Sequence, residues 1–149
     1  MNENPYAAPR STLTERTTAG DIRLYSPQQA AGGAFLGGPV GVIYFIWANF
    51  RALGNEAAAR STLGYGLLGL VVVLILVVIL PEGIPNVPFT IAYVVIAQQV
   101  VTKLQVSKQQ IIDTPEYDFH SNWRVLGLGL LSLLGSIACL GLPLLLIGA

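Results

Sequence analysis

The chain has 149 residues, of which 53% are hydrophobic and only 11% charged, and its formal net charge is zero. Typical soluble domains carry about 25% charged residues, so this composition excludes an ordinary soluble domain. A net charge of zero gives no electrostatic basis for binding nucleic acid. The length allows one domain.

Four long stretches contain no charged residue: 28–50, 61–81, 83–102 and 125–149. An α-helix needs roughly 20 apolar residues to cross a bilayer, and each stretch is about that long. The sequence therefore predicts an all-α integral membrane protein, a compact bundle of four transmembrane helices over residues 28–149. Residues 1–27 mix arginines, acids and prolines, which predicts a flexible polar tail with an ordered edge at residues 22–25.

The first apolar stretch is rich in glycine. Gly33, Gly37 and Gly41 follow one another at intervals of four, which places them on one face of a helix. Small residues at this spacing let a second helix approach closely, so this face is predicted to pack against another helix. Pro39 lacks a backbone donor and is expected to kink the helix. Two alternatives stay open: a kinked helix that crosses the membrane, or a re-entrant element over residues 32–41.

The next two stretches are predicted to form an antiparallel helical hairpin. A loop over residues 51–60 precedes the second helix, which is expected at residues 62–80. Three prolines in residues 81–88 exclude a continuous helix there. The third helix is expected to start near Pro88, leave the membrane at Lys103 and continue as a wet helix through Gln110. Asn49, at the end of the first stretch, is expected to be solvated.

Polar side chains inside the stretches are few. Gln98 and Gln99 form the most polar point, and one of them is expected to face a neighbouring helix and form an interhelical hydrogen bond. The functional alternative is a polar point on a substrate path or a contact with a partner helix. In the fourth stretch, Ser132 and Ser136 are spaced so that they form a second small face for helix packing.

The distribution of Lys and Arg predicts the orientation, because cytoplasmic loops are enriched in both. Loops one and three contain Arg51, Arg60, Lys103, Lys108 and Arg124, so these loops are expected in the cytoplasm. Four full spans would then place both termini, and the three tail arginines, outside. A re-entrant first element would bring all eight basic residues to one side. Trp47 and Trp123 are expected to anchor span ends at the interface.

The sequence predicts no catalytic, cofactor or metal site. Ion-coupled and proton-coupled transport usually needs an ionisable residue within the bundle, and none of the four stretches contains one. One polar loop carries ligand-type side chains, namely Asp113, Glu116, Asp118 and His120, which zinc or manganese can use. Their spacing matches no established metal motif and Pro115 interrupts them, so the sequence favours a solvated loop.

The N-terminal segment Asn4-Pro5-Tyr6-Ala7-Ala8-Pro9 resembles the start of many uncharacterised bacterial small membrane proteins. The stretch from Tyr25-Ser26-Pro27 through Gly37-Gly38-Pro39 to Asn49-Phe50-Arg51 is also similar to one such group. The resemblance covers about the first third of the chain. It implies a bacterial inner-membrane location, and it carries over no activity and no site residue.

These observations predict a non-enzymatic membrane protein, an accessory or assembly subunit that acts through helix packing. Its expected partners are the lipid bilayer and either other membrane proteins or further copies of the chain. The alternative is a small oligomeric channel or transporter. A pore should show polar residues recurring along one helix face, and only Gln98 and Gln99 suggest this.

Overall fold

The computed structural model describes residues 20–80 and 85–147. This part of the chain is mostly helical, and four of its helices are long and apolar enough to cross a membrane. The mainly helical class expected from the sequence is therefore confirmed. In chain order the elements are β1 (Ile22–Leu24), α1 (Pro27–Ala52), α2 (Glu56–Ile79), α3 (Val87–Val100), the π-helical turn η1 (Val101–Gln105), α4 (Lys108–Asp113), β2 (Tyr117–Phe119) and α5 (Asn122–Ile147).

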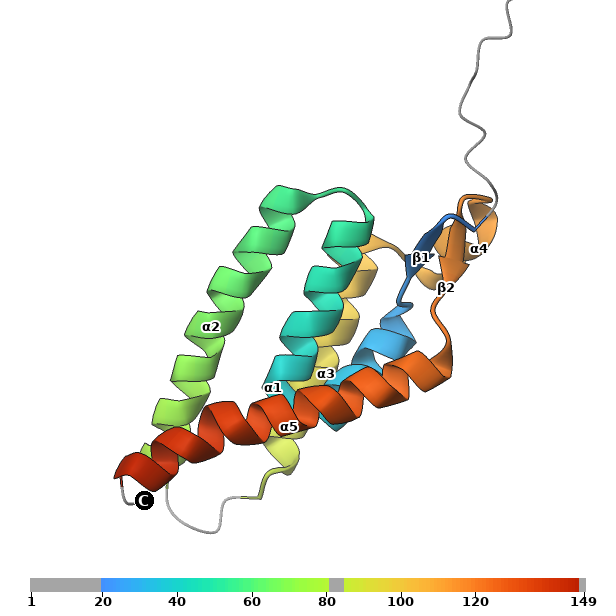
Figure 1. The fold of residues 1–149 in the computed structure, drawn as a ribbon. Helices are drawn as coiled ribbons and strands as arrows, with labels where there is room; N and C mark the ends of the chain where they lie inside the picture. Colours follow the sequence, from blue (N-terminus) through green and yellow to red (C-terminus); the bar gives the residue numbers. More distant parts are fainter. Residues whose placement is uncertain (1–19, 81–84, 148–149) are drawn as a thin grey trace, which may run out of the picture.

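Helix α1 is folded back on itself. Gly38 breaks it with φ 60° and ψ −147°, a left-handed conformation that glycine adopts without strain. Pro39 follows and removes the next backbone donor. The first arm, residues 27–37, runs away from β1, and the second arm, residues 39–52, returns toward the start of α2 (Figure 1). The two ends of α1 meet, because the Tyr25 backbone N–H donates to Asn49 Oδ1 at 2.8 Å.

Glycines let the two arms of α1 touch. A Cβ added at Gly33 would overlap the buried Phe45 ring of the second arm. A Cβ added at Gly41 would lie 2.7 Å from the Gly33 carbonyl oxygen. The prediction of one straight face through Gly33, Gly37 and Gly41 is therefore wrong, because the break at Gly38 turns Gly41 back toward Gly33. The three glycines pack within this chain.

The second arm of α1 lies at the centre of the molecule, with α2, α3 and α5 packed around α1. Helix α2 begins at Glu56, six residues earlier than predicted, because Asn55 caps it by accepting from the Ala58 backbone N–H at 3.0 Å. The loop between α1 and α2 is correspondingly short. Helix α5 runs obliquely across α1 instead of standing parallel to α2 (Figure 1).

The expected extension of the third helix through Gln110 is wrong. The helix ends with η1 at Gln105, and Val106 is extended and buried. A new helix, α4, then starts behind Ser107, whose side chain accepts from the Gln110 backbone N–H in a capping box. Helix α3 and η1 together measure about 28 Å at 1.5 Å per residue, close to the ~30 Å hydrocarbon core.

A small cap joins the ordered edge of the tail to the polar loop. Strand β1 pairs in parallel with β2, so that Ile22 lies opposite Tyr117 and Leu24 opposite Phe119. Leu24 packs with Val106 and Ile111 in a small apolar cluster beneath this pair. The edge predicted at residues 22–25 is thus a strand, and the loop predicted around it contains β2. Residues 1–19 of the predicted tail lie outside the described residues.

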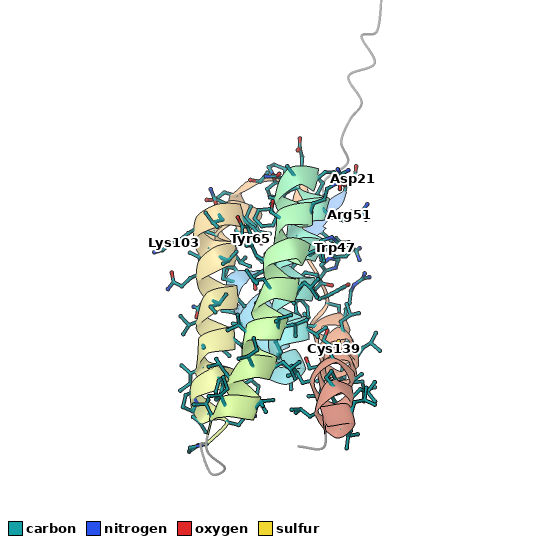
Figure 2. The ribbon with its side chains drawn as sticks, turned by 90° about the vertical axis from the view of Figure 1, so that its left-hand side faces the viewer. Asp21, Trp47, Arg51, Tyr65, Lys103 and Cys139 are labelled. Atoms are coloured by element: carbon teal, nitrogen blue, oxygen red, sulfur yellow. The ribbon has the colours of Figure 1, made fainter. Side chains whose placement is uncertain are left out.

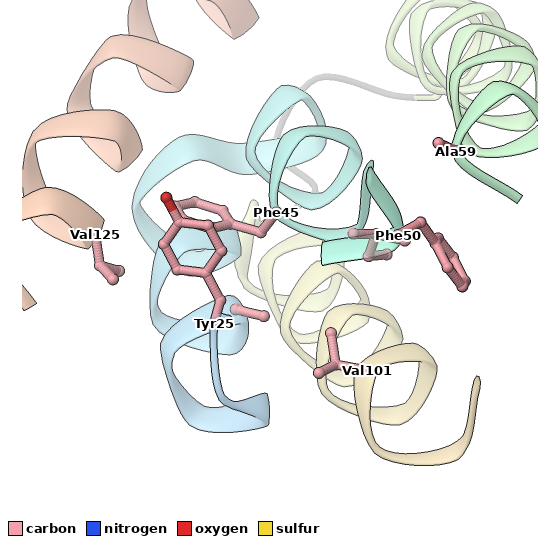
Figure 3. Close-up of a cluster of buried hydrophobic side chains, with 8 residues drawn as sticks. Tyr25, Phe45, Phe50, Ala59, Val101 and Val125 are labelled. Carbon is pink, nitrogen blue, oxygen red and sulfur yellow. The ribbon is translucent and has the colours of Figure 1, made fainter. Parts of the chain in front are cut away.

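The main apolar core gathers side chains from four helices and from the segment before α1 (Figure 3). Tyr25 and Phe45 are its largest fully buried members, and their rings meet edge to face at a centroid distance of 4.8 Å. Ala59 of α2, Val101 of η1 and Val125 of α5 complete the cluster. The core therefore lies where the two ends of α1 meet, beside the cap.

Candidate functional site

Asn49 holds together the two ends of α1 and the end of α3. Its side chain is 1% exposed. Oδ1 accepts from the Tyr25 backbone N–H, and Nδ2 donates to the Tyr25 carbonyl at 2.8 Å and to Gln105 Oε1 at 3.0 Å. Gln105 Nε2 in turn donates to the Ile46 carbonyl at 2.7 Å. The expectation that Asn49 is solvated is wrong, because its amide satisfies the backbone at the start of α1.

Tyr25 connects this amide pair to α5 and to the cap. Arg124 Nε donates to Tyr25 Oη at 3.2 Å, and the His120 ring lies against the Tyr25 ring at a centroid distance of 4.2 Å. Burial raises the pKa of Tyr25, and the hydrogen bond from Arg124 opposes this rise. Burial is also the main cause of the lowered pKa of His120, to which the positive charges of Arg124 and Arg23 contribute. His120 is therefore held in its neutral form.

Gln29 ties the first turn of α1 to the start of α5. Its backbone N–H donates to Ser26 Oγ at 3.2 Å, while its Oε1 accepts from the Ser26 backbone N–H at 3.1 Å. The same side chain donates from Nε2 to the His120 carbonyl at 2.7 Å and to Asn122 Oδ1 at 2.8 Å. These side chains form one polar network, which joins the end of β1, both ends of α1, η1 and α5. Its members are Tyr25, Gln29, Asn49, Gln105 and Arg124.

The bend of α1 is fixed by α5. Ser136 Oγ donates to the Gly37 carbonyl at 2.6 Å and accepts from the Val40 backbone N–H at 3.2 Å. Both backbone groups are at the break around Gly38, where regular helical bonding stops. Ser132 lies one turn away, and a Cβ added at Gly37 would be 2.7 Å from its Cβ. The two serines are both buried, and they bind the tip of the α1 hairpin.

Gln98 and Gln99 are both on the exposed surface of α3. Neither is buried between helices of this chain, which differs from the expectation that one would face a neighbouring helix. The fully buried residues here are instead Ala97 of α3 and Val101 of η1. The two amides therefore lie on a face of α3 that no other described element covers.

The two tryptophans differ in their surroundings. Trp47 is half-buried near the end of α1, and the Arg51 guanidinium carbon lies 5.3 Å from its ring centroid. Trp123 is 81% exposed in the first turn of α5. Arg51 also forms an ion pair with Glu56 at 3.5 Å. Both rings are thus at helix ends next to an arginine, as interfacial residues often are.

The polar loop shows no metal-binding geometry. Among the described residues, no group of three or more His, Cys, Asp or Glu side chains is close enough to hold a metal ion. Asp118 accepts from the Phe119 backbone N–H at 2.7 Å and lies 4.0 Å from Arg23 across the β1–β2 pair. His120 packs on Tyr25. The ligand-type side chains of this loop therefore serve local structure.

An apolar groove of about 770 Å³ lies between the second arm of α1, α2 and α3. Aliphatic and aromatic side chains form most of its wall, from Ala58 to Leu76 along α2 and from Phe89 to Leu104 along α3 and η1. Helices α2 and α3 both pack against α1 but scarcely touch each other. The groove is therefore the gap that this arrangement leaves. Gly69 contributes to its wall and has no other atom within 4 Å of an added Cβ.

Comparison with protein-family models, with curated proteins and with solved structures finds no match to this chain.

Sequence reasoning missed the polar network because residues of these types are common in solvated loops. Asn49, Gln105 and Gln29 are far apart in the chain and form no motif. One signal was present: Asn49 is the only strongly polar side chain between Gln29 and Arg51. A single amide inside an apolar helix needs a partner, and this requirement could have indicated burial.

Proposed function

We propose that this chain is an integral protein of the bacterial inner membrane, which it crosses with α2, with α3 and η1, and with α5. Helix α1 enters and returns on one side. The two arms of α1 measure about 16 Å and 21 Å at 1.5 Å per residue, and neither can cross a ~30 Å hydrocarbon core. The contact between Tyr25 and Asn49, which brings the ends of α1 together, supports this topology.

This topology gathers the basic residues on one side. Strand β1 pairs with β2, so the tail joins the same end of the molecule as the loop that follows η1. The loop between α1 and α2 is also there, because the end of α1 lies beside Tyr25. The six Lys and Arg residues of the described part then belong to this end, which the positive-inside rule assigns to the cytoplasm. The loop between α2 and α3 and the end of α5 face the other side.

Cysteine accessibility in intact cells tests the topology. In a Cys139→Ser background, Asp21→Cys and Ile112→Cys should react with a membrane-impermeant maleimide only after the cells are opened. Pro85→Cys should react in intact cells. Labelling of Asp21→Cys in intact cells would show that α1 crosses the membrane, as the model of four full spans requires.

The proposed role is that of a non-enzymatic accessory or assembly subunit, which binds another membrane helix. The observation that carries it is the exposure of Gln98 and Gln99 on α3. Gln98 lies about 10 Å along the helix from Gln105 at the end of η1, so in the proposed topology both amides would lie within the hydrocarbon region. An amide without a hydrogen-bonding partner is costly in an apolar medium. A helix with a polar residue at this depth would satisfy both glutamines.

The polar side chains that bind backbone groups support a structural role over a catalytic one. Asn49 donates to the Tyr25 carbonyl before α1, and Gln105 donates to the Ile46 carbonyl within it. Ser136 donates to the Gly37 carbonyl at the bend of α1, and Gln29 donates to the His120 carbonyl. These side chains hold the fold together. The alternative, a small oligomeric channel or transporter, draws on the same exposed glutamines, which would face one another if copies assembled through α3.

A double substitution tests the helix-binding role. The variant Gln98→Leu/Gln99→Leu should fold with unchanged thermal stability but lose the higher-mass complex that the purified wild-type chain forms in mild detergent or retains from the membrane. Gln28→Leu, an exposed glutamine in the first turn of α1, is the matched control. If the double variant keeps the same complex as the control, the exposed amides do not bind a helix. Ion flux through vesicles that contain only a homo-oligomer would favour the channel.

A further inference from the structure

The size of the groove between α1, α2 and α3 indicates what can occupy it. Its volume of about 770 Å³ lies within the ~300–1,000 Å³ range of pockets that bind small molecules. Its wall on α2 extends from Ala58 to Leu76, about 27 Å along the helix axis. The groove is therefore long for its volume, a shape that suits a slender molecule.

The composition of the wall indicates an apolar occupant. Among the residues that the structure describes, no charged side chain lines the groove. The hydroxyl groups of Ser61 and Thr62 donate to helix carbonyls, at 3.0 Å to Ala57 and at 2.9 Å to Ala58. The length of the groove is close to the ~30 Å thickness of the hydrocarbon core. In a bilayer, a flexible hydrocarbon chain meets these requirements, because it buries apolar surface without leaving a polar group unpaired.

One end of the groove is polar, and two basic residues are next to its lining residues in the chain. Ser61, Thr62 and Tyr65 line it at the end next to the loop between α1 and α2. Arg60 directly precedes Ser61 in α2, and Lys103 directly precedes Leu104, which also lines the groove, in η1. Neither cation forms an ion pair with a carboxylate of the described residues. Figure 2 shows Tyr65 of α2 and Lys103 of η1 at a similar height. Long basic side chains at a helix end extend to the headgroup level.

We propose that this groove binds an acyl chain of an anionic glycerophospholipid from the surrounding bilayer, with its phosphate held at the end marked by Arg60 and Lys103. The inference rests on the proposed insertion of α2 and α3 in the membrane. The apolar wall explains why an acyl chain enters, and the two unpaired cations explain why an anionic headgroup is preferred.

Native mass spectrometry of the full chain, with phosphatidylglycerol and phosphatidylcholine added in turn, tests the acyl-chain site. Gly69→Leu should fill the groove without a clash, since no atom lies within 4 Å of an added Cβ. This variant should lose the bound phosphatidylglycerol that the wild-type chain retains. Gly64→Leu is the matched control, because Gly64 is on the same helix, has equally open space and does not line the groove. It should retain the lipid.

The headgroup preference is tested by Arg60→Gln/Lys103→Gln. Each cation near an anionic lipid surface contributes a factor of about five in affinity. The double variant should therefore bind phosphatidylglycerol roughly 25-fold more weakly, and phosphatidylcholine as the wild-type chain does. This measurement decides the headgroup part of the proposal even if Gly69→Leu does not fold.

Three results would overturn the proposal. The first is equal retention of phosphatidylglycerol by Gly69→Leu and Gly64→Leu. The second is equal binding of both lipids to the wild-type chain. The third is a change in oligomer size or partner binding, in place of lipid loss, in Gly69→Leu, which would show that a helix occupies the groove. Extraction of cell membranes with alkaline carbonate separates these results from failure of the proposed function, because a chain that is not inserted would be released.

Discussion

Helices α1 and α2 are similar in length but opposite in burial. Helix α1 has 26 residues and α2 has 24, with mean hydropathies of 1.5 and 2.8 in their most apolar windows. In those windows, 44% of the α1 residues are buried and none of the α2 residues. The more apolar helix is thus the less buried one. In the proposed membrane-inserted state, apolar side chains gain little by leaving the lipid for protein, so hydropathy does not decide which helix becomes central.

The residues that differ between the two helices explain the contrast. Helix α1 contains glycines at its contacts and one buried amide, Asn49, whereas α2 presents an uninterrupted run of Val, Leu and Ile from Leu70 to Leu80. Small residues bring backbones together, and a buried polar group requires a specific partner. Hence α1 specifies the fold, and α2 offers a surface that lipid can cover.

The largest effect should come from removing the buried amide. Asn49→Leu leaves the Tyr25 N–H, the Tyr25 carbonyl and Gln105 without their partner, and a buried unsatisfied group costs about 1–3 kcal/mol. We expect a loss of about 3 kcal/mol in the free energy of unfolding, measured by denaturation in mixed micelles. Asn86→Leu, at an exposed position without a side-chain cap bond, should change it little. Equal losses in the two variants would contradict the role of Asn49.

Substitutions at two neighbouring glycines, Gly32 and Gly33, test whether the two arms of α1 are in contact. Gly33→Ala places a methyl group against the buried Phe45 ring, and overpacking of this kind costs about 1–3 kcal/mol. Gly32→Ala, one residue earlier, meets no atom within 4 Å and should be neutral or slightly stabilising. The thermal midpoints of the two variants in detergent give the comparison. If Gly33→Ala is as stable as Gly32→Ala, the arms are not in contact.

The hydrogen bonds at the bend of α1 should have a moderate effect. Ser136→Ala removes the acceptor of the Val40 N–H and the donor to the Gly37 carbonyl. We expect a loss of about 1–2 kcal/mol, measured by the same unfolding assay. Ser61→Ala is the control, since Ser61 is exposed and bonds only within its own helix. A neutral Ser136→Ala would indicate that α5 does not fix the bend.

A smaller effect should appear as pH dependence. His120 has a lowered pKa in the folded protein, so the unfolded chain binds more protons as the pH falls below about 6.5. The contribution of His120 to the free energy of unfolding should therefore be fully present above that pH. It should decrease as the pH falls through that value and level off below the pKa of the folded state. His120→Phe keeps an aromatic ring against Tyr25 and should remove this part of the dependence. Identical profiles of thermal midpoint against pH for both proteins would exclude the contribution.

The smallest effect is expected on the outer face of α2. Leu67 is 65% exposed, and Leu67→Val should change the free energy of unfolding by less than about 0.5 kcal/mol. The matched substitution Ile46→Val, in the buried second arm of α1, should cost about 0.5–1.5 kcal/mol. A similar cost for the two variants would mean that α2 is covered by protein.

Residues around the bend show how far sequence reasoning reaches. Pro39 and its neighbouring glycines indicated that the first helix is interrupted, and a re-entrant element was one of two alternatives. Only the φ angle of Gly38, together with the contact between Gly33 and Phe45, shows that the helix reverses direction. A proline kinks a helix by an amount that its own sequence does not specify, because packing partners elsewhere in the chain set the angle.

The amino-acid sequence by itself determined the mainly helical class and the four long apolar helices, since these depend on local composition and length. Only the tertiary structure decided that α1 folds back, that Asn49 and Gln105 are structural, and that Gln98 and Gln99 are exposed. These features depend on contacts such as that between Ser136 and Gly37, 99 residues apart. Local periodicity carries no information about a partner at that distance, and small and polar residues take their role from whichever group they meet.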